Sequence, residues 1–146
     1  PESSLFHKWS PIPGTTLYER ARKDRLLVSN DGITENFEFK DEKVAEVLNL
    51  LDYFTKKYGD EYHKMQSAAA ESMKTLEERT SNESLEMLLK RAYFVVRTPV
   101  EVLWIAHTSV LRGLSGRDMI DAYCQQKLPA IESGNYDYEV KMPLLE

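Results

Sequence analysis

Cysteine is almost absent from this chain, which has only Cys124 among its 146 residues. A single cysteine cannot form a disulfide within the chain, so the composition predicts a reducing, cytoplasmic compartment. Because no other cysteine and no histidine lies near Cys124 in the sequence, we interpret it as a small buried apolar group rather than as a nucleophile.

Long apolar runs and an excess of positive charge are also missing. The longest apolar run, Val100 to Ile105, is interrupted by Glu101, whereas a membrane-spanning helix needs roughly 20 apolar residues. The chain has 19 Lys and Arg against 24 Asp and Glu, which gives a net charge of −5. Nucleic acids and anionic membranes bind clustered Lys and Arg, so we expect no nucleic-acid partner and no membrane partner.

Complete catalytic motifs are missing as well. The chain has no Gly-x-Ser-x-Gly elbow and no glycine-rich loop that ends in Lys-Ser or Lys-Thr. Asp60 and His63 are three residues apart, as metal ligands are on the helices of a di-metal bundle, but such a site needs a second pair. Glu101 and His107 are six apart and fall on different helix faces. His107 lies among Trp104 and Leu111, so we expect it as a hydrogen-bonded core histidine, and we expect His63 on a solvated face. We therefore assign no catalytic residue and no metal ligand, and a metal-binding bundle stays as a third hypothesis.

Helical periodicity is what the chain does have, from Asp41 onward. Apolar side chains recur three and four residues apart, as on one face of a helix. The first such series is Val44, Val47, Leu48, Leu51, Phe54 and Tyr58. The same spacing continues through residues 60–79, and Gly59 either kinks one long helix or separates two.

Two further helix starts are predicted by capping signals. Thr98-Pro99-Val100-Glu101 is a capping box with proline at the first helical position, which predicts that a new helix begins there. Ser115-Gly116-Arg117-Asp118 resembles a second box, and Pro129 is expected to limit the helix that follows it. In total the pattern predicts a mainly α protein, a bundle-like domain of five or six helices with a short β or irregular N-terminal segment.

The chain divides into three expected parts. Residues 1–40 form an extended or β segment with one helix and a turn, residues 41–132 the helical domain, and residues 133–146 an extended tail. Within the first part, residues 5–13 are expected to be a short strand or extended, and Asn30-Asp31-Gly32 is a strong turn signal.

The most distinctive local sequence is a proline-rich turn, Ser10-Pro11-Ile12-Pro13-Gly14-Thr15-Thr16-Leu17-Tyr18-Glu19. Its prolines favour extended backbone, Gly14 permits a positive φ, and Thr15 or Thr16 can cap a helix. The extended segment should therefore end at Pro13, and a helix should begin within Thr15 to Leu17.

Residues 13–19 resemble the Pro-Gly-Thr-x-Leu-Tyr-Glu pattern that many radical SAM enzymes carry after the last strand of their barrel. The resemblance implies that Pro11, Ile12 and Pro13 pack near the adenine of S-adenosylmethionine. This chain departs from the family in a decisive respect, because the iron–sulfur cluster of those enzymes needs three closely spaced cysteines and only Cys124 is present.

Our leading hypothesis is therefore that this chain is the C-terminal helical portion of a radical SAM-type enzyme and is not catalytic alone. It begins at Pro1 rather than at Met, which indicates an excised domain, a processed product or an incomplete sequence. S-adenosylmethionine and the iron–sulfur cluster would be bound by the parent enzyme, with no cofactor held by this chain alone. The partner would be the remainder of that enzyme, and the helices would shape a substrate pocket or a docking surface. The alternative is a non-catalytic protein–protein interaction module that binds a partner helix or self-associates through an apolar groove.

Overall fold

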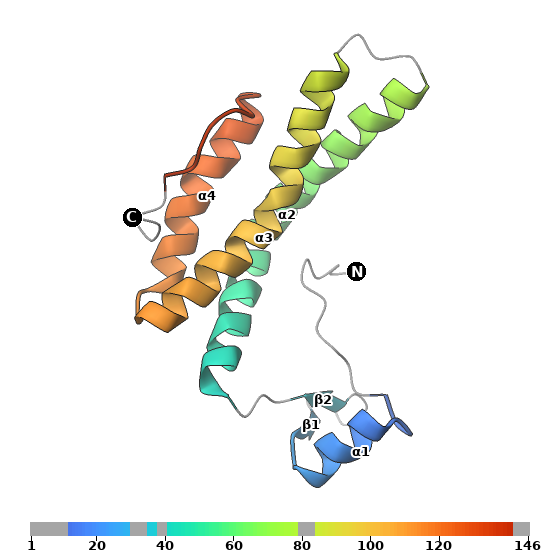
Figure 1. The fold of residues 1–146 in the computed structure, drawn as a ribbon, viewed down its shortest axis with the longest axis vertical. Helices are drawn as coiled ribbons and strands as arrows, with labels where there is room; N and C mark the ends of the chain where they lie inside the picture. The colour runs from blue at the N-terminus through green and yellow to red at the C-terminus, as the bar shows by residue number, and fades with distance from the viewer. Residues whose placement is uncertain (1–11, 30–34, 38–40, 79–83, 142–146) are drawn as a thin grey trace.

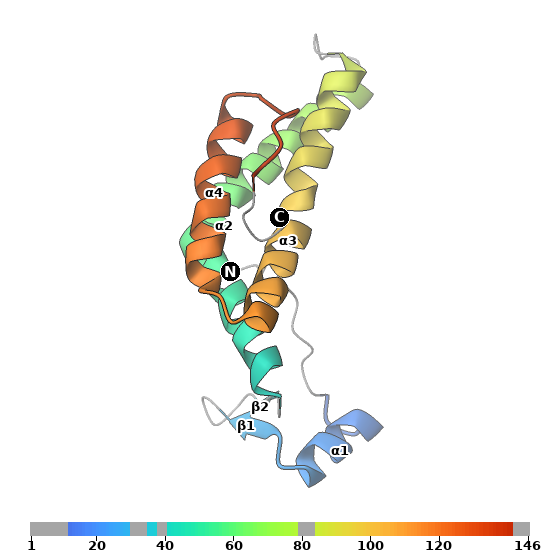
Figure 2. The ribbon, with the colours of Figure 1, turned by 60° about the vertical axis from the view of Figure 1, so that its left-hand side comes forward.

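Three long helices packed side by side make up most of the structure (Figures 1 and 2). The computed structural model describes residues 12–29, 35–37, 41–78 and 84–141. Within these residues the order of elements is α1 (Thr16–Lys23), β1 (Leu27–Ser29), β2 (Glu35–Phe37), α2 (Glu42–Glu77), α3 (Leu85–Arg112) and α4 (Gly116–Glu132). The helices α2, α3 and α4 run alternately up and down, and each contacts the other two. The mainly α class is thus confirmed.

The described residues form four helices rather than the predicted five or six. One reason is that residues 42–77 are a single helix, α2, with Gly59 buried inside it. A glycine inside a helix costs about 1 kcal/mol relative to alanine. The neighbouring turns bury Phe54 and Tyr62 in the core, and this packing keeps the helix continuous through Gly59.

The second reason is that α3 passes through Pro99, so the helix start predicted at Thr98 is wrong. Proline has no backbone N–H and therefore leaves the carbonyl four residues earlier, that of Val95, without its helical donor. The Tyr62 hydroxyl of α2 donates a hydrogen bond to this carbonyl, with an oxygen–oxygen distance of 3.1 Å. A side chain from the neighbouring helix thus replaces the missing backbone bond.

Capping residues determine where α3 ends and where α4 begins. Gly113 ends α3 with a φ of 66°, and the Leu114 N–H bonds to the Ser109 carbonyl at 2.9 Å, the arrangement of a left-handed C-cap. Ser115 caps α4 through its hydroxyl, as its capping box predicts. The limit expected at Pro129 is wrong, because α4 continues to Glu132. The carbonyl that this proline frees belongs to Gln125, which is exposed and can bind water.

The N-terminal elements lie apart from the three long helices, beyond the start of α2 (Figure 1). As predicted, α1 begins at Thr16, two residues after Gly14, which has a φ of 86°, and Thr15 is its N-cap. The strands β1 and β2 are three residues each and pair antiparallel, with Leu27 opposite Phe37. The β segment expected over residues 5–13 is not supported: residues 1–11 lie outside the described residues, and the chain from residue 12 to residue 15 forms a turn.

The core lies between the three long helices in two adjoining clusters. The larger one joins Leu51 and Phe54 of α2, Val102 and Ile105 of α3, and the buried face of α4. Cys124 belongs to it, and burial raises the pKa of its thiol to about 12, so the interpretation as a buried apolar group is confirmed. The chain from 133 to 141 has neither helix nor strand, and its partly buried aromatic and apolar side chains pack against the two clusters.

Candidate functional site

The proline-rich turn is held by its own hydrogen bonds while its apolar side chains face solvent. The Thr15 hydroxyl donates to the Ile12 carbonyl at 2.9 Å and accepts from the Tyr18 N–H at 3.2 Å. Ile12 is 61% exposed, and Pro13 and Leu17 are exposed too. Pro11 lies outside the described residues. Binding of adenine by Pro11, Ile12 and Pro13 stays a prediction.

The acid–histidine pair considered for a metal does not gather further ligands. His63 is half-buried, and its Nδ1 lies 3.3 Å from the Gln66 Oε1. His107 is exposed rather than in the core, because the face of α3 that carries it points away from α2 and α4. Across the described part of the chain, no group of three or more His, Cys, Asp or Glu side chains is placed to hold a metal ion.

A cavity of about 510 Å³ lies where α3, α4 and the segment 136–140 meet. We call it the aromatic cavity, because six of the side chains that line it are aromatic: Tyr93, Phe94, Trp104, Tyr123, Tyr136 and Tyr138. Its volume is within the range of small-molecule sites, which are mostly apolar with a few placed polar groups. Those polar groups are gathered around Glu101.

The Glu101 carboxylate joins three donors from α3 and α4. Arg97 contacts its Oε1 at 3.0 Å, while the Tyr123 hydroxyl donates to Oε2. Lys127 Nζ lies 3.4 Å from Oε2 and 3.4 Å from the centre of the Phe94 ring. One carboxylate therefore faces two cations, so the inner wall of the cavity has an excess of one positive charge when Lys127 is protonated.

Lys127 is the unusual member of this group, since its side chain is only 1% exposed. An ammonium group has three donors, but Glu101 is its only hydrogen-bond acceptor among the described residues. Burial lowers the pKa of Lys127, and the charge and hydrogen bond of Glu101 oppose part of that shift. Burial together with the charge of Glu101 raises the pKa of Tyr123, which keeps this phenol a hydrogen-bond donor.

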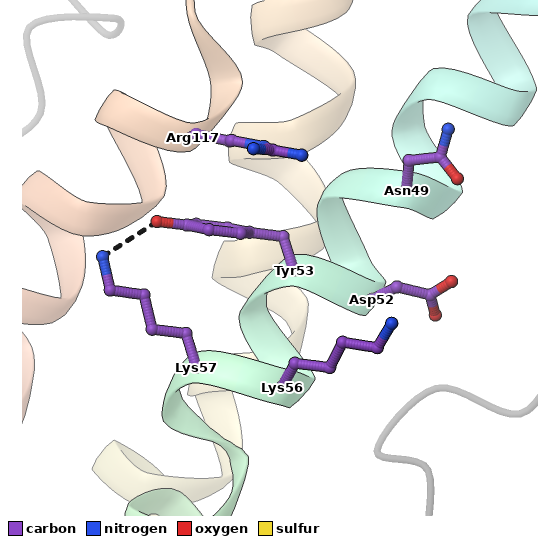
Figure 3. A pocket seen from close by; sticks show the side chains of 6 residues that line it. All are labelled: Asn49, Asp52, Tyr53, Lys56, Lys57 and Arg117. Atoms are coloured by element: carbon purple, nitrogen blue, oxygen red, sulfur yellow. Dashed lines mark hydrogen bonds between the residues drawn. The ribbon is translucent and has the colours of Figure 1, made fainter.

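A second, shallower pocket of about 480 Å³ lies between α2 and α4 and is polar (Figure 3). In this pocket Arg117 of α4 lies over the Tyr53 ring of α2, with 5.1 Å from guanidinium to ring centre. Beside them, Asp121 accepts hydrogen bonds from Tyr53 at 2.8 Å, Tyr58 at 2.6 Å and Lys57 at 2.9 Å. The polar groups beside this pocket are thus bonded to one another across α2 and α4.

The ionisation of this group follows from its pairing. Burial acts to raise the pKa of Asp121, but the donors Tyr58, Lys57 and Tyr53 together hold it below its ordinary value. Burial and the neighbouring carboxylate raise the pKa of Tyr58 to about 12. Because Asp121 already has three donors, we interpret the group as a clamp between α2 and α4 rather than as a reactive site.

The outer face of α3 is an apolar stripe that no described residue covers. We call it the α3 seam, and it consists of Leu85, Leu89, Tyr93, Val96, Val100, Leu103, Trp104 and Leu111, each at least 45% exposed. Val100 in its middle is 68% exposed and Tyr93 is 65% exposed. From Leu85 to Leu103 successive members are three or four residues apart, and Trp104 and Leu111 extend the same side, so the seam lies on one face of the helix, opposite its buried face.

Because both faces of α3 are apolar, it is the one helix in the described ranges long and apolar enough to cross a membrane by length and composition. Half of that apolar window is buried inside the protein. The core helix of a soluble protein meets the same criterion.

Sequence reasoning missed the aromatic cavity and the α3 seam, although each left a signal. Lys127 is three residues after Cys124 and four before Ile131, so the helical period places it on the buried face of α4. On α3, an outward-facing apolar series that includes Val96, Val100 and Leu103 interleaves with the core series, so spacing alone does not separate the two. No protein family, curated protein or solved structure matches this chain.

Proposed function

We propose that this chain is a helical interaction module that binds a second copy of itself through the α3 seam. The observation that carries the proposal is the row of large exposed apolar side chains along α3. Monomeric proteins rarely expose an apolar patch of more than a few hundred Å², and larger patches mark interaction sites. Eight large side chains, most of them about half exposed or more, amount to a patch of that kind.

The spacing of the α3 seam fits another helix better than it fits a flat surface. From Leu89 the outward-facing positions alternate by four and three residues through Tyr93, Val96, Val100, Leu103 and His107. This is the spacing of the positions that interlock between the two helices of a coiled coil.

A second copy fits because the α3 seam is nearly symmetric about its middle. In an antiparallel pair of seams, Val96 of one copy would lie opposite Val100 of the other, and Tyr93 opposite Leu103. Such a pairing is a symmetric dimer, in which both molecules use the same patch and each contact occurs twice, so no seam is left to add a third copy. The interface would cover the α3 seam without requiring any other surface.

Val100→Glu tests the proposal, with Val44→Glu on α2 as its control. Val44 is also exposed on a helix but lies outside the α3 seam. We expect a dimer for the wild type, and at least tenfold weaker dimerisation, about 1.4 kcal/mol, for Val100→Glu, because the interface would bury two unpaired carboxylates. Val44→Glu should dimerise like the wild type.

Sedimentation equilibrium over a range of concentrations measures this association. A wild type that stays monomeric at about 100 μM, where even a weak micromolar dimer would form, contradicts the proposal. Equal effects of the two substitutions contradict it too. Circular dichroism of each variant establishes that the helices are intact.

A second candidate function is the helical portion of a radical SAM-type enzyme. What supports it is the proline-rich turn, where Gly14 has a positive φ, α1 begins at Thr16, and Ile12 and Leu17 remain exposed for contact with another body. In that case S-adenosylmethionine would be cleaved by residues outside this chain, and the helices would shape a substrate pocket or docking surface.

The residues encoded before Pro1 discriminate this candidate from the interaction module. A Cys-x3-Cys-x2-Cys pattern upstream supports the enzyme, because these thiolates hold its cluster, and an initiator Met directly before Pro1 rules it out. The candidate also implies that this chain alone binds S-adenosylmethionine weakly or not at all. Tight binding in the absence of iron, measured by calorimetry, would count against it.

A further inference from the structure

We infer that the aromatic cavity binds a small aromatic monocarboxylate, whose carboxylate is held by Lys127 and Arg97 and whose ring packs on the aromatic walls. The aromatic cavity shares Tyr93 and Trp104 with the α3 seam, but Lys127 and Arg97, which would hold the carboxylate, lie outside the seam. The inference depends on the burial of Lys127, on the charges around it and on the shape of the cavity.

The buried ammonium is the first step of the argument. A buried charge is costly unless it is paired and its hydrogen bonds are made. Lys127 Nζ has one acceptor among the described residues, at 3.4 Å, which is long for a hydrogen bond between charged groups. The face of the Phe94 ring, 3.4 Å from Nζ at its centre, is its other close partner. Since a ring face accepts at most one of the three N–H groups, the ammonium has a donor left for a ligand in the cavity that Lys127 lines.

The charge balance around Glu101 sets the charge of the ligand. The Glu101 carboxylate forms ion pairs with both Arg97 and Lys127, and it also accepts a hydrogen bond from the Tyr123 hydroxyl. A ligand with one negative charge would balance the positive charge of the inner wall, where Arg97 and Lys127 face the single carboxylate of Glu101. Over the whole lining, three cations and three carboxylates sum to zero. A more highly charged anion is disfavoured, because Asp137 and Glu139 also line the cavity and Asp137 is paired with Lys90 at 3.3 Å.

The aromatic walls and the volume of the cavity determine what kind of ring system the ligand carries. Phe94 and Tyr136 meet edge to face with 6.0 Å between ring centres, and the Arg91 guanidinium lies over the Tyr136 ring, 5.6 Å from its centre. This wall is built before any ligand arrives. Aromatic rings pack on such walls in offset or edge-to-face arrangements, and a volume of about 510 Å³ admits one or two fused rings.

The experiment compares 2-naphthoate with its uncharged analogue 2-naphthamide by isothermal titration calorimetry on the full chain. Wild-type protein should bind 2-naphthoate with a Kd below about 1 mM and bind 2-naphthamide at least tenfold more weakly. Lys127→Met, which keeps the length of the side chain without its charge, should weaken naphthoate by roughly tenfold or more. It should leave the affinity for naphthamide unchanged.

Two further variants make the outcome specific. Lys56→Met removes an exposed lysine from the other pocket and should leave naphthoate binding unchanged. Val100→Glu should also bind naphthoate, because Val100 does not line the aromatic cavity. Since this variant is expected to be monomeric, its binding tests the cavity apart from the α3 seam pairing, which shares Tyr93 and Trp104 with it. The inference is overturned if wild-type protein fails to bind naphthoate at about 1 mM, or if Lys127→Met binds it as tightly as the wild type.

Discussion

Lys127 shows at the scale of one residue how burial and pairing compete. Its ammonium is removed from water by α3 and α4, and the carboxylate it faces also serves Arg97 and Tyr123. Replacing the lysine by Met therefore removes a poorly paired charge, while Glu101 keeps two of its three partners. We expect Lys127→Met to cost less than about 1 kcal/mol, or to stabilise the fold, as buried ion pairs often do when replaced by apolar groups.

The pH dependence of stability is the sharper measurement for this residue. Because burial lowers the pKa of Lys127 below its ordinary value of 10.5, the unfolded chain binds more protons than the folded one between the two values. Stability linked to this group therefore rises with pH in that window.

Urea unfolding from pH 7 to pH 10 tests the sign. The free energy of unfolding of the wild type should increase relative to that of Lys127→Met as the pH rises. Taking the difference between the two proteins cancels the opposite contribution of Tyr123 and Cys124, whose pKa values burial raises. Lys56→Met controls for the loss of one surface charge. A difference that falls with pH would contradict the burial of a charged Lys127.

At the scale of one element, α3 shows how tertiary contacts decide where a helix ends. The predicted caps Thr15 and Ser115 occur at true helix starts, where their hydroxyls accept backbone N–H groups, and Ser84, which was not predicted, caps α3 in the same way. The box at Thr98 has the same local chemistry, yet the helix runs through it, because Tyr62 supplies the bond that Pro99 removes. Capping signals are local and can be read from the sequence, whereas this replacement depends on a residue 37 positions away.

A double-mutant cycle at Tyr62 and Pro99 can measure the hydrogen bond between the Tyr62 hydroxyl and the Val95 carbonyl. Tyr62→Phe leaves that buried carbonyl without a donor, and we expect a loss of about 1–3 kcal/mol in the free energy of unfolding. Pro99→Ala restores a backbone N–H that can reach the same carbonyl, so Tyr62→Phe should cost clearly less in that background. Chemical denaturation of the four proteins measures both values. Equal costs in the two backgrounds would show that the hydroxyl does not compensate for the proline.

At the scale of the whole molecule, the helical content could be predicted from the sequence but the outward faces could not. The series from Val44 to Tyr58 correctly marks a helix whose apolar residues include the core positions Leu51 and Phe54. On α3, apolar residues occupy nearly the whole circumference, so periodicity cannot say which face α2 and α4 cover. The aromatic cavity likewise needs three segments to meet, and only the fold brings residues 136–140 to α3 and α4.

The separation of the N-terminal elements from the three long helices predicts two levels of protection. The core clusters consist of residues from α2, α3, α4 and the segment after α4, while most of α1 is exposed. Backbone amides of α1 should therefore exchange through local opening, and those of α2–α4 only through larger unfolding. Hydrogen exchange followed by mass spectrometry would show this, and equal protection of α1 and α3 would contradict it.

The contact between Tyr62 and Pro99 also bears on how α2 and α3 align along their length. Two long apolar helices can in principle slide past each other in small steps, since each residue advances the helix by only 1.5 Å. Inside α3 the other carbonyls are occupied by their own helical N–H groups, and proline leaves free the one at Val95. The Tyr62 hydroxyl of α2 therefore finds a free acceptor only when it lies beside Val95 along the axis of α3. The proline, which weakens α3 as an isolated helix, thereby selects one register of the helical pair against all its shifted alternatives.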